Sequence, residues 1–333
     1  MDKITNVSVI GAGAWGTTIA NHLANKNYPV SIWAFEKEVV LNINNKRENS
    51  VYLPQIKLSK KIKAFFDIEE TVKNADVIVI AIPTKHLRKC LENNNFAFNK
   101  KTIFLSLTKG IEKNTFKRPS EIISETKNTK KICALSGPNL SLEIAKGLPA
   151  ATVIASANIE DAKKLQEIFS SSNFRVYTSD DIIGVEIGGA LKNVIAIAAG
   201  ISDGLKLGNN AKSGLIVRGI KEITRLGVKI GANKETFFGL SGIGDLITTC
   251  QSDLSRNHFV GYEIAKGKKL KDILSRMKAI PEGVETTLSA FELSKKLGVE
   301  MPITNEIHSV LFEDKNPKDA IINLMTRPYK NEN

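Results

Sequence analysis

The sequence predicts an α/β protein, with a doubly wound, mostly parallel sheet in its first part and an all-helical C-terminal domain after it. Short apolar runs alternate with polar helical segments up to residue 177, a pattern typical of buried parallel strands joined by helices. Beyond that point, helical patterns punctuated by glycine continue to the end. A chain of 333 residues usually forms more than one domain. We therefore expect one domain over residues 1–180 and a helical one over residues 181–333.

The elements of the first domain follow from local patterns. The apolar run 7–10 predicts a strand, residues 17–25 have the spacing of a helix, and the run 30–34 predicts a second strand. Further buried strands are expected at residues 77–82, 102–107, 132–135 and 151–155. Three stretches rich in lysine and asparagine, 57–63, 93–101 and 127–131, indicate solvated loops and helix faces.

Two helices of the second domain carry end signals. Residues 211–226 and 288–297 have helical patterns that we expect to be closed by Gly227 and Gly298. The apolar window 182–201 is long enough to span a membrane, but it contains Glu186 and Lys192. A buried helix of a soluble protein is therefore expected there, with no stable membrane insertion. The N-terminal residues lack the pattern of a signal peptide.

The composition limits the compartment and the partners. The net charge of +12 suits anionic small molecules, nucleic acid or an acidic membrane surface. Only 6% of the residues are aromatic, and the lysines are dispersed, which argues against nucleic-acid binding. The three cysteines, Cys90, Cys133 and Cys250, are widely spaced, so we expect neither disulfides nor a zinc site and infer a cytoplasmic protein. The histidines have no metal-ligand spacing, so no metal is expected.

A dinucleotide-binding motif follows the first strand. Gly11, Gly13 and Gly16 form G-x-G-x-x-G between the strand and the opening of a helix. In this Rossmann-type context the first glycine permits a tight turn, the second lets a pyrophosphate approach the backbone, and the third lets helix and strand pack closely. Glu36, 20 residues after Gly16, can bind the ribose 2′-hydroxyl of NAD and repel the 2′-phosphate of NADP, although Lys37 acts in the opposite sense.

Several polar residues elsewhere indicate a substrate site. Lys192 stands alone in an apolar helical stretch, where desolvation favours its neutral form and suits it to act as a general base. Asp245 follows a glycine-rich turn at an expected helix start. Ser255, Arg256 and Asn257 precede another helix, where their side chains can bind a phosphate. Lys109 and Gly137 follow strands, at the edge of a parallel sheet where ligands bind.

Eight segments, in this order over nearly the whole chain, carry a resemblance to a known family: GAGAWG, LTKGIE, SGPNLSLEIAKGLP, IGGALKNVIAIAAGISDG, GLSGIGDLITTC, SRN, EG and MPIT. Together they closely resemble bacterial NAD(P)-dependent glycerol-3-phosphate dehydrogenase. The resemblance implies a dinucleotide domain joined to a helical domain, and a homodimer as the assembly. It also implies the interconversion of dihydroxyacetone phosphate and sn-glycerol 3-phosphate for phospholipid synthesis.

The resemblance also implies roles for individual residues. Lys192 would accept the proton, acting with Lys109 and Asp245, and the substrate would be bound by Lys109, Gly137, Asn139, Lys192, Asp245, Ser255, Arg256 and Asn257. The cofactor would be bound by Gly11, Gly13, Ala14, Trp15, Gly16, Phe35, Glu36, Lys109, Ser141, Arg256, Ile280 and Glu282. The chain departs from the family at Phe35, where relatives often have Arg or His, and at Asn139 and Ser141, which replace the commoner Ser or Thr and Ala. We expect both NAD and NADP to be used, with a slight preference for NAD.

Three other functions fit parts of the pattern. A related two-domain hydroxyacid dehydrogenase would also use a helical lysine, but its substrate would carry a carboxylate in place of the phosphate that the SRN segment suits. A dinucleotide-binding regulator without turnover would not need Lys192 and Asp245, and both are present. A nucleic-acid binder would rest on the net charge alone.

Overall fold

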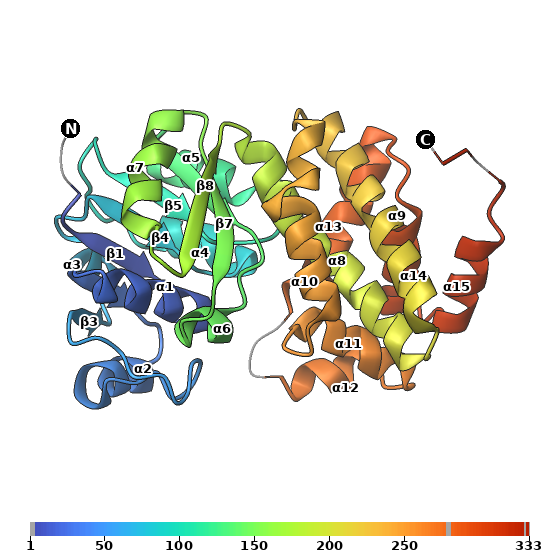
Figure 1. The fold of residues 1–333 in the computed structure, drawn as a ribbon, viewed down its shortest axis with the longest axis horizontal. Coiled ribbons are helices and arrows are strands. Elements are labelled where there is room, and N and C mark those ends of the chain that lie inside the picture. Colours follow the sequence, from blue (N-terminus) through green and yellow to red (C-terminus); the bar gives the residue numbers. More distant parts are fainter. Residues whose placement is uncertain (1–3, 278–280, 330, 333) are drawn as a thin grey trace. The chain divides into compact units, whose positions relative to one another are not determined.

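The structure, a computed structural model, describes residues 4–277, 281–329 and 331–332 (Figure 1). The chain divides into two compact units. Met1–Lys109 and Lys117–Glu186 form the first, which we call the sheet unit. Gly110–Phe116 and Ile187–Asn333 form the second, which we call the helical unit.

The sheet unit is built on one eight-stranded sheet with the strand order β3-β2-β1-β4-β5-β6-β7-β8. Neighbouring strands are parallel except β6 and β7, which are antiparallel. The predicted doubly wound, mostly parallel sheet is thus confirmed. The strands are β1 (Val7–Ile10), β2 (Val30–Trp33), β3 (Ile62–Phe65), β4 (Val77–Ile80), β5 (Ile103–Ser106), β6 (Ile132–Ser136), β7 (Ala150–Ala155) and β8 (Phe174–Ser179).

Each face of this sheet has its own apolar core. Along β4, Val77 and Val79 belong to one core and Ile78 and Ile80 to the other, because successive side chains of a strand point to opposite faces. Residues of α1 and α7 join the first core, and residues of α3, α4 and α5 join the second. The helices are α1 (Ala14–Asn25), α2 (Lys37–Leu41), η1 (Asn42–Lys46), α3 (Ile68–Val72), α4 (Thr84–Asn93), α5 (Pro119–Lys127), α6 (Ser141–Ala145) and α7 (Ile159–Phe169).

The sequence patterns missed two strands of this sheet. Strand β3 begins inside the stretch 57–63, which the sequence predicts to be a solvated loop or helix face, and this is wrong for residues 62 and 63, which lie in the strand. The prediction also fails at Leu58, Phe96 and Lys127 of the three stretches, which are buried. Ile62 and Ala64 are buried while Lys63 is exposed, so the strand alternates as a half-exposed edge strand does. Four residues are too few for this alternation to stand out beside a run of lysines. Strand β8 is likewise an edge strand with alternating burial.

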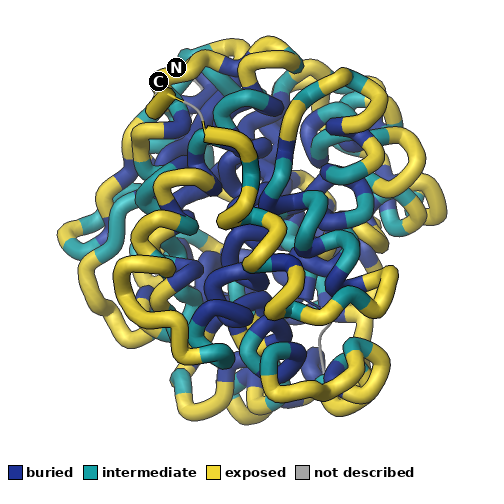
Figure 2. The backbone as a smooth tube through the Cα atoms, turned by 90° about the vertical axis from the view of Figure 1, so that its right-hand side faces the viewer, coloured by how far each residue is buried: buried dark blue, intermediate teal, exposed yellow. Residues whose placement is uncertain are grey.

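The helical unit is formed mainly by long helices. Helix α8 (Ile182–Gly204) carries the chain from the sheet unit into it. This helix is long and apolar enough to cross a membrane, but 89% of its apolar window is buried within the structure, as a core helix is. In Figure 2, which colours the backbone by burial, dark blue marks buried segments and yellow marks exposed ones, many of them turns. The other elements are α9 (Gly208–Lys229), η2 (Lys234–Phe238), η3 (Leu240–Gly244), α10 (Asp245–Gln251), α11 (Arg256–Ala265), α12 (Leu270–Ser275), α13 (Glu282–Leu297), α14 (Pro302–Phe312) and α15 (Pro317–Met325).

The two expected glycine end signals have different outcomes. Gly298 caps α13 with a φ of 65°, as predicted. Gly227 does not end α9, which continues to Lys229, and this prediction is wrong. A Cβ on Gly227 would lie 2.1 Å from Cζ of Phe237. The glycine therefore makes room for an aromatic ring instead of ending the helix.

Candidate active site

The three glycines after β1 have three different surroundings. Gly11 has a φ of +113°, and a Cβ on Gly16 would lie 2.0 Å from the carbonyl oxygen of Gly11, so both are needed for the turn and its close packing. A Cβ on Gly13 would meet no atom of the described residues within 4 Å. The backbone is thus open at Gly13, which is also the N-cap of α1 and has no capping side chain. The turn fits the pyrophosphate of a dinucleotide, which the first amides of α1 can bind.

Two further residues expected at the cofactor lie beside this turn. Trp15, after Ala14 in the first turn of α1, has a buried Nε1 with no hydrogen-bond partner among the residues that the structure describes. A buried donor of this kind is costly unless something else accepts from it. Ser141 begins α6, and its carbonyl oxygen accepts a hydrogen bond of 3.2 Å from Thr18 of α1. The Trp15 Nε1–H can therefore donate to a bound dinucleotide.

The end of β2 carries the residues that we expect near the ribose. Phe35 is 81% exposed, and its ring lies edge to face with that of Trp33, 6.4 Å between centroids. Glu36 is exposed and accepts a hydrogen bond of 2.6 Å from the hydroxyl of Tyr52. This hydrogen bond to Glu36, together with partial burial, raises the pKa of Tyr52 to about 12. Tyr52 therefore remains a donor and orients the carboxylate.

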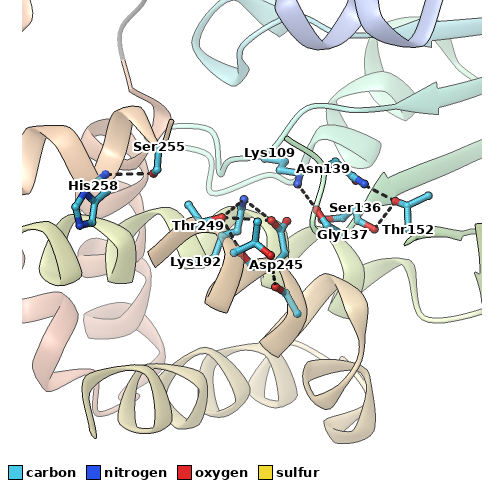
Figure 3. Close-up of polar contacts among 12 residues, drawn as sticks. Lys109, Ser136, Gly137, Asn139, Thr152, Lys192, Asp245, Thr249, Ser255 and His258 are labelled. Carbon is cyan, nitrogen blue, oxygen red and sulfur yellow. Dashed lines mark hydrogen bonds and ion pairs between the residues drawn. The ribbon is translucent and has the colours of Figure 1, made fainter. Parts of the chain in front are cut away.

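Lys109 and Gly137 come together after β5 and β6. The Lys109 ammonium donates a hydrogen bond of 3.2 Å to the carbonyl oxygen of Gly137 (Figure 3). Gly137 is required because a Cβ would lie 3.0 Å from Cα of Thr152 on β7. The structure thus places a cation at the carboxyl edge of the sheet, as expected for a lysine that follows a parallel strand.

Asn139 lies in the same loop. Its Oδ1 accepts a hydrogen bond of 3.0 Å from the hydroxyl of Thr152. Its Nδ2 is buried and has no partner among the described residues. Because the amide is held by Thr152, its second group can donate to a ligand oxygen.

In the helical unit, Lys192 is not a lone charge. Its ammonium lies 2.6 Å from Oδ1 of Asp245 and donates a hydrogen bond of 2.7 Å to the hydroxyl of Thr249 (Figure 3). The side chains of Lys192 and Asp245 are 9% and 1% exposed. Desolvation, the basis of the expectation from the sequence, favours a neutral lysine. The buried carboxylate opposes that effect, because it stabilises the ammonium form.

Glycines bring the two partners together. A Cβ on Gly188, one turn before Lys192 on α8, would lie 2.5 Å from the carbonyl oxygen of Ser241. The backbone of η3 can therefore touch α8, and α10 starts at Asp245 immediately after η3. Asp245 is the first residue of α10, as predicted, but the glycine-rich segment before it is the π-helix η3 and not a turn. Cys250, near the ion pair, stays a thiol because burial raises its pKa to about 12.

Ser255 is the N-cap of α11, and Arg256 and Asn257 lie in its first turn, whereas the sequence predicted all three to precede the helix. The Ser255 Oγ accepts a hydrogen bond of 3.2 Å from the backbone N–H of His258. Arg256 is exposed, and Asn257 is buried. A guanidinium, a hydroxyl and the first amides of a ten-residue helix form an anion-binding group.

Gly283 of α13 lies between this anion-binding turn and the helix that carries Lys192. Asn257 Oδ1 accepts a hydrogen bond of 3.0 Å from the backbone N–H of Gly283. A Cβ on Gly283 would lie 2.6 Å from that oxygen and 2.8 Å from the carbonyl oxygen of Asn193, the residue after Lys192. Glu282, expected at the cofactor, is the first residue of α13 and adjoins Gly283. Ile280 lies outside the described residues.

Two partners of the predicted residues were not found from the sequence. Thr249 lies four residues after Asp245, so both share one face of α10, and this helical spacing could have indicated it. Tyr52 lies in an irregular segment between η1 and β3, and no local pattern relates it to Glu36.

Comparisons with known proteins identify the family. Residues 6–162 match the model of the NAD-dependent glycerol-3-phosphate dehydrogenase N-terminus, and residues 181–322 match the model of its C-terminus. The chain is 46% identical over 330 residues to glycerol-3-phosphate dehydrogenase (NAD(P)+) of Syntrophotalea carbinolica, covering 98% of this chain and 99% of the relative. It is 47% identical over 333 residues to the enzyme of the same name from Bacillus licheniformis, covering 99% and 96%.

A solved structure of a relative has the same fold. The crystal structure of glycerol-3-phosphate dehydrogenase from Coxiella burnetii superimposes with a TM-score of 0.93 at 35% identity, covering 98% of this chain and 99% of the other. The glycine turn of the sheet unit and the buried Lys192 pair of the helical unit thus occur in a chain that matches these relatives from end to end. The chain belongs to the NAD(P)-dependent glycerol-3-phosphate dehydrogenase family and is an oxidoreductase of that kind.

Proposed function

We propose that this chain interconverts dihydroxyacetone phosphate and sn-glycerol 3-phosphate, with Lys192 transferring the proton and Ser255, Arg256 and Asn257 holding the phosphate. The observation that carries the proposal is the buried ion pair of Lys192 and Asp245 beside an anion-binding turn. Oxidation of a secondary alcohol needs a hydride acceptor, a base for the hydroxyl proton, and positive charge for the alkoxide and the phosphate. The nicotinamide cofactor, when bound, supplies the hydride chemistry.

Lys192 suits proton transfer in both directions. As an ammonium it donates a proton to the carbonyl oxygen when the ketone is reduced, and as an amine it accepts the hydroxyl proton in the reverse direction. Asp245 and Thr249 fix the position of its Nζ, with both contacts at 2.7 Å or less. Thr249 also donates a hydrogen bond of 2.7 Å to the carbonyl oxygen of Asp245, so its lone pair faces the ammonium. Catalysis gains from a proton-transfer group that is held in place before the substrate arrives.

The phosphate and the polar end of the substrate have separate donors. Arg256 can hold the phosphate with two parallel hydrogen bonds, and Ser255 and the amides of α11 can add neutral ones. We assign Lys109, Gly137 and Asn139 of the sheet unit to the substrate as well. Lys109 contributes positive charge and Asn139 a buried amide donor. A carboxylate substrate would not need a phosphate-binding turn of this kind.

For the cofactor, we propose that both NAD and NADP are used, with a modest preference for NAD. Glu36 is oriented by Tyr52 and should repel a 2′-phosphate, and Phe35 cannot donate to one. Lys37 is exposed next to Glu36 and offsets part of this repulsion. Two exposed unit charges at about 4 Å interact by only about 1 kcal/mol in water, so strict discrimination is not expected.

The wider assignments follow the family. We propose that residues 1–180 bind the dinucleotide and that residues 181–333 supply the catalytic and phosphate-binding groups. We also propose a cytoplasmic homodimer that provides glycerol 3-phosphate for phospholipid synthesis, as the resemblance implies.

The test is the oxidation of NADH and of NADPH by the purified chain with dihydroxyacetone phosphate. Turnover is expected with both cofactors, and a 2-oxo acid of similar size should give almost none. Preferential turnover of the 2-oxo acid would favour a hydroxyacid dehydrogenase. Tight dinucleotide binding without turnover of either compound would favour a regulator.

A further inference from the structure

A second charged cluster of the helical unit lies on the same helix as Lys192. Asp203, near the end of α8, accepts hydrogen bonds on Oδ2 from Lys212 Nζ of α9 at 2.6 Å and from His258 Nε2 of α11 at 2.7 Å. The His258 side chain is 9% exposed and that of Lys212 is 20% exposed. Burial by itself would raise the pKa of Asp203, but the hydrogen bonds from Lys212 and His258 lower it below its ordinary value. The carboxylate therefore stays charged and joins three helices.

This cluster faces the same way along α8 as the ion pair. Lys192 and Asp203 are separated by about three helical turns, or about 16 Å of rise, so their side chains leave the helix on one face. Helix α11 lies directly against the intervening part of α8. A Cβ on Gly200 would lie 1.9 Å from the carbonyl oxygen of His258, and a Cβ on Gly261 would lie 1.9 Å from that of Ile197. The two backbones are in contact, and the glycines permit it.

His258 belongs to the turn that we assign to the phosphate. It follows Asn257 directly, and its backbone N–H donates to the Ser255 cap. The first turn of α11 thus has two side-chain anchors on other helices. Asn257 is fixed at its Oδ1 to the backbone of α13, and His258 is fixed through Asp203 to α8 and α9. Arg256 is exposed and stands between the Ser255 cap and these anchors.

We propose that Asp203 is a positioning residue for the substrate phosphate: through His258 and Lys212 it holds the first turn of α11 in the orientation in which Ser255, Arg256 and Asn257 bind the phosphate. The proposal rests on the function proposed above. The anchoring is needed because glycine contacts fix how closely two helices approach but leave them able to slide or rotate. The charge-assisted hydrogen bonds of Asp203 remove that freedom.

The expected effect is selective for the phosphate. Without the Asp203 charge, His258 and Lys212 keep at most a weaker, neutral acceptor, and the phosphate donors are held less firmly before the substrate binds. Lys192 lies about three turns away on α8 and keeps its contact with Asp245 of α10. Weaker phosphate binding with unchanged chemistry raises KM and leaves kcat nearly constant.

The experiment compares Asp203→Asn with Glu263→Gln, an acid-to-amide change at the other end of α11, where Glu263 pairs with Lys268. We expect Asp203→Asn to raise KM for dihydroxyacetone phosphate about tenfold, which corresponds to about 1.4 kcal/mol. Its kcat should stay within about twofold, and turnover of phosphate-free dihydroxyacetone should be unchanged. Asp203→Glu, which keeps the charge, should recover part of the loss, and Glu263→Gln should behave as the parent enzyme.

His258→Phe tests the same link without removing the carboxylate, and His258→Gln is its conservative partner. We expect His258→Phe to raise KM for the phosphorylated substrate and His258→Gln to raise it less, since the Gln amide can donate to Asp203. An unchanged KM in folded His258→Phe, or equal losses for phosphorylated and phosphate-free substrates, would overturn the proposal. Failure of the parent chain to turn over dihydroxyacetone phosphate would instead refute the proposed function.

Discussion

The charged residues of the candidate site have different surroundings in the two units. In the sheet unit, Glu36 and its neighbour Lys37 are exposed, and the glycine turn that we propose for the cofactor offers mainly backbone groups. In the helical unit, Lys192 and Asp245 are buried and paired. Electrostatic effects grow as water is excluded. The comparison therefore predicts large effects for changes to buried charges of the helical unit and small effects for changes to exposed charges of the sheet unit.

The largest effect on stability is expected at Asp245. Asp245→Ala leaves the Lys192 ammonium buried without its carboxylate, and breaking a buried pair in this way typically costs about 3 to 5 kcal/mol. We expect a clear fall in Tm, measured by thermal unfolding. The double variant Lys192→Met with Asp245→Leu removes both charges and should recover much of the loss while staying inactive. A double variant no more stable than Asp245→Ala would show that charge burial is not the cause.

Glu222 of α9 should make stability depend on pH. Its carboxylate accepts hydrogen bonds from the backbone N–H groups of Ile303 and Thr304 at the start of α14, at 2.6 and 3.2 Å. Burial nevertheless raises its pKa from 4.5 to about 7. Between these values the folded protein binds more protons than the unfolded chain, so the free energy of unfolding should fall as pH rises from 4.5 to about 7, by on the order of 3 kcal/mol.

Denaturant titrations across that pH range measure this change. Glu222→Gln cannot titrate, so its stability curve should be flatter than that of the parent enzyme over the same interval. Glu300→Gln, at an exposed acid of the same unit, serves as the control and should keep the parent slope. If the parent and Glu222→Gln curves run parallel, Glu222 is not the titrating group.

Arg256→Ala should weaken phosphate binding. Loss of a charge-assisted hydrogen bond costs about 1.5 to 3 kcal/mol, so KM for dihydroxyacetone phosphate should rise by about tenfold or more. Turnover of phosphate-free dihydroxyacetone should change far less. Arg276→Ala removes an exposed arginine after α12 and should have little effect. Similar losses with and without the phosphate group would rule out a phosphate role for Arg256.

The smallest effect is expected at Glu36. Glu36→Ser should raise kcat/KM for NADPH severalfold, within the roughly 1 kcal/mol available to an exposed charge, and leave NADH little changed. Lys37→Ala should lower kcat/KM for NADPH alone. If Glu36→Ser leaves the ratio between the two cofactors unchanged, the acid does not face the ribose.

The two units also differ in what the sequence could predict, because the signals of the glycine turn are local and the contacts of Lys192 join distant residues. The glycine turn is a local signal, because Gly11, Gly13 and Gly16 act within one strand, turn and helix. Helix starts at Asp245 and after Ser255 were also local. The partner of Lys192 lies 53 residues away, and no periodicity relates two such positions. The role of Gly227 likewise depends on a contact with another element, because the glycine makes room for the ring of Phe237. No local pattern could distinguish this role from that of a helix-ending glycine. The resemblance, not the pattern, grouped these distant residues into one site.

The central claim is that Lys192 transfers the proton in the helical unit while dinucleotide binding rests mainly on the sheet unit. Lys192→Ala tests it most directly, by titration with NADH and steady-state turnover of dihydroxyacetone phosphate in one preparation. We expect NADH affinity within a few-fold of the parent value and kcat lower by about 10² to 10⁴, the usual contribution of general acid–base catalysis. Retained kcat in the folded variant, or a loss of NADH affinity as large as the loss of turnover, would contradict the claim.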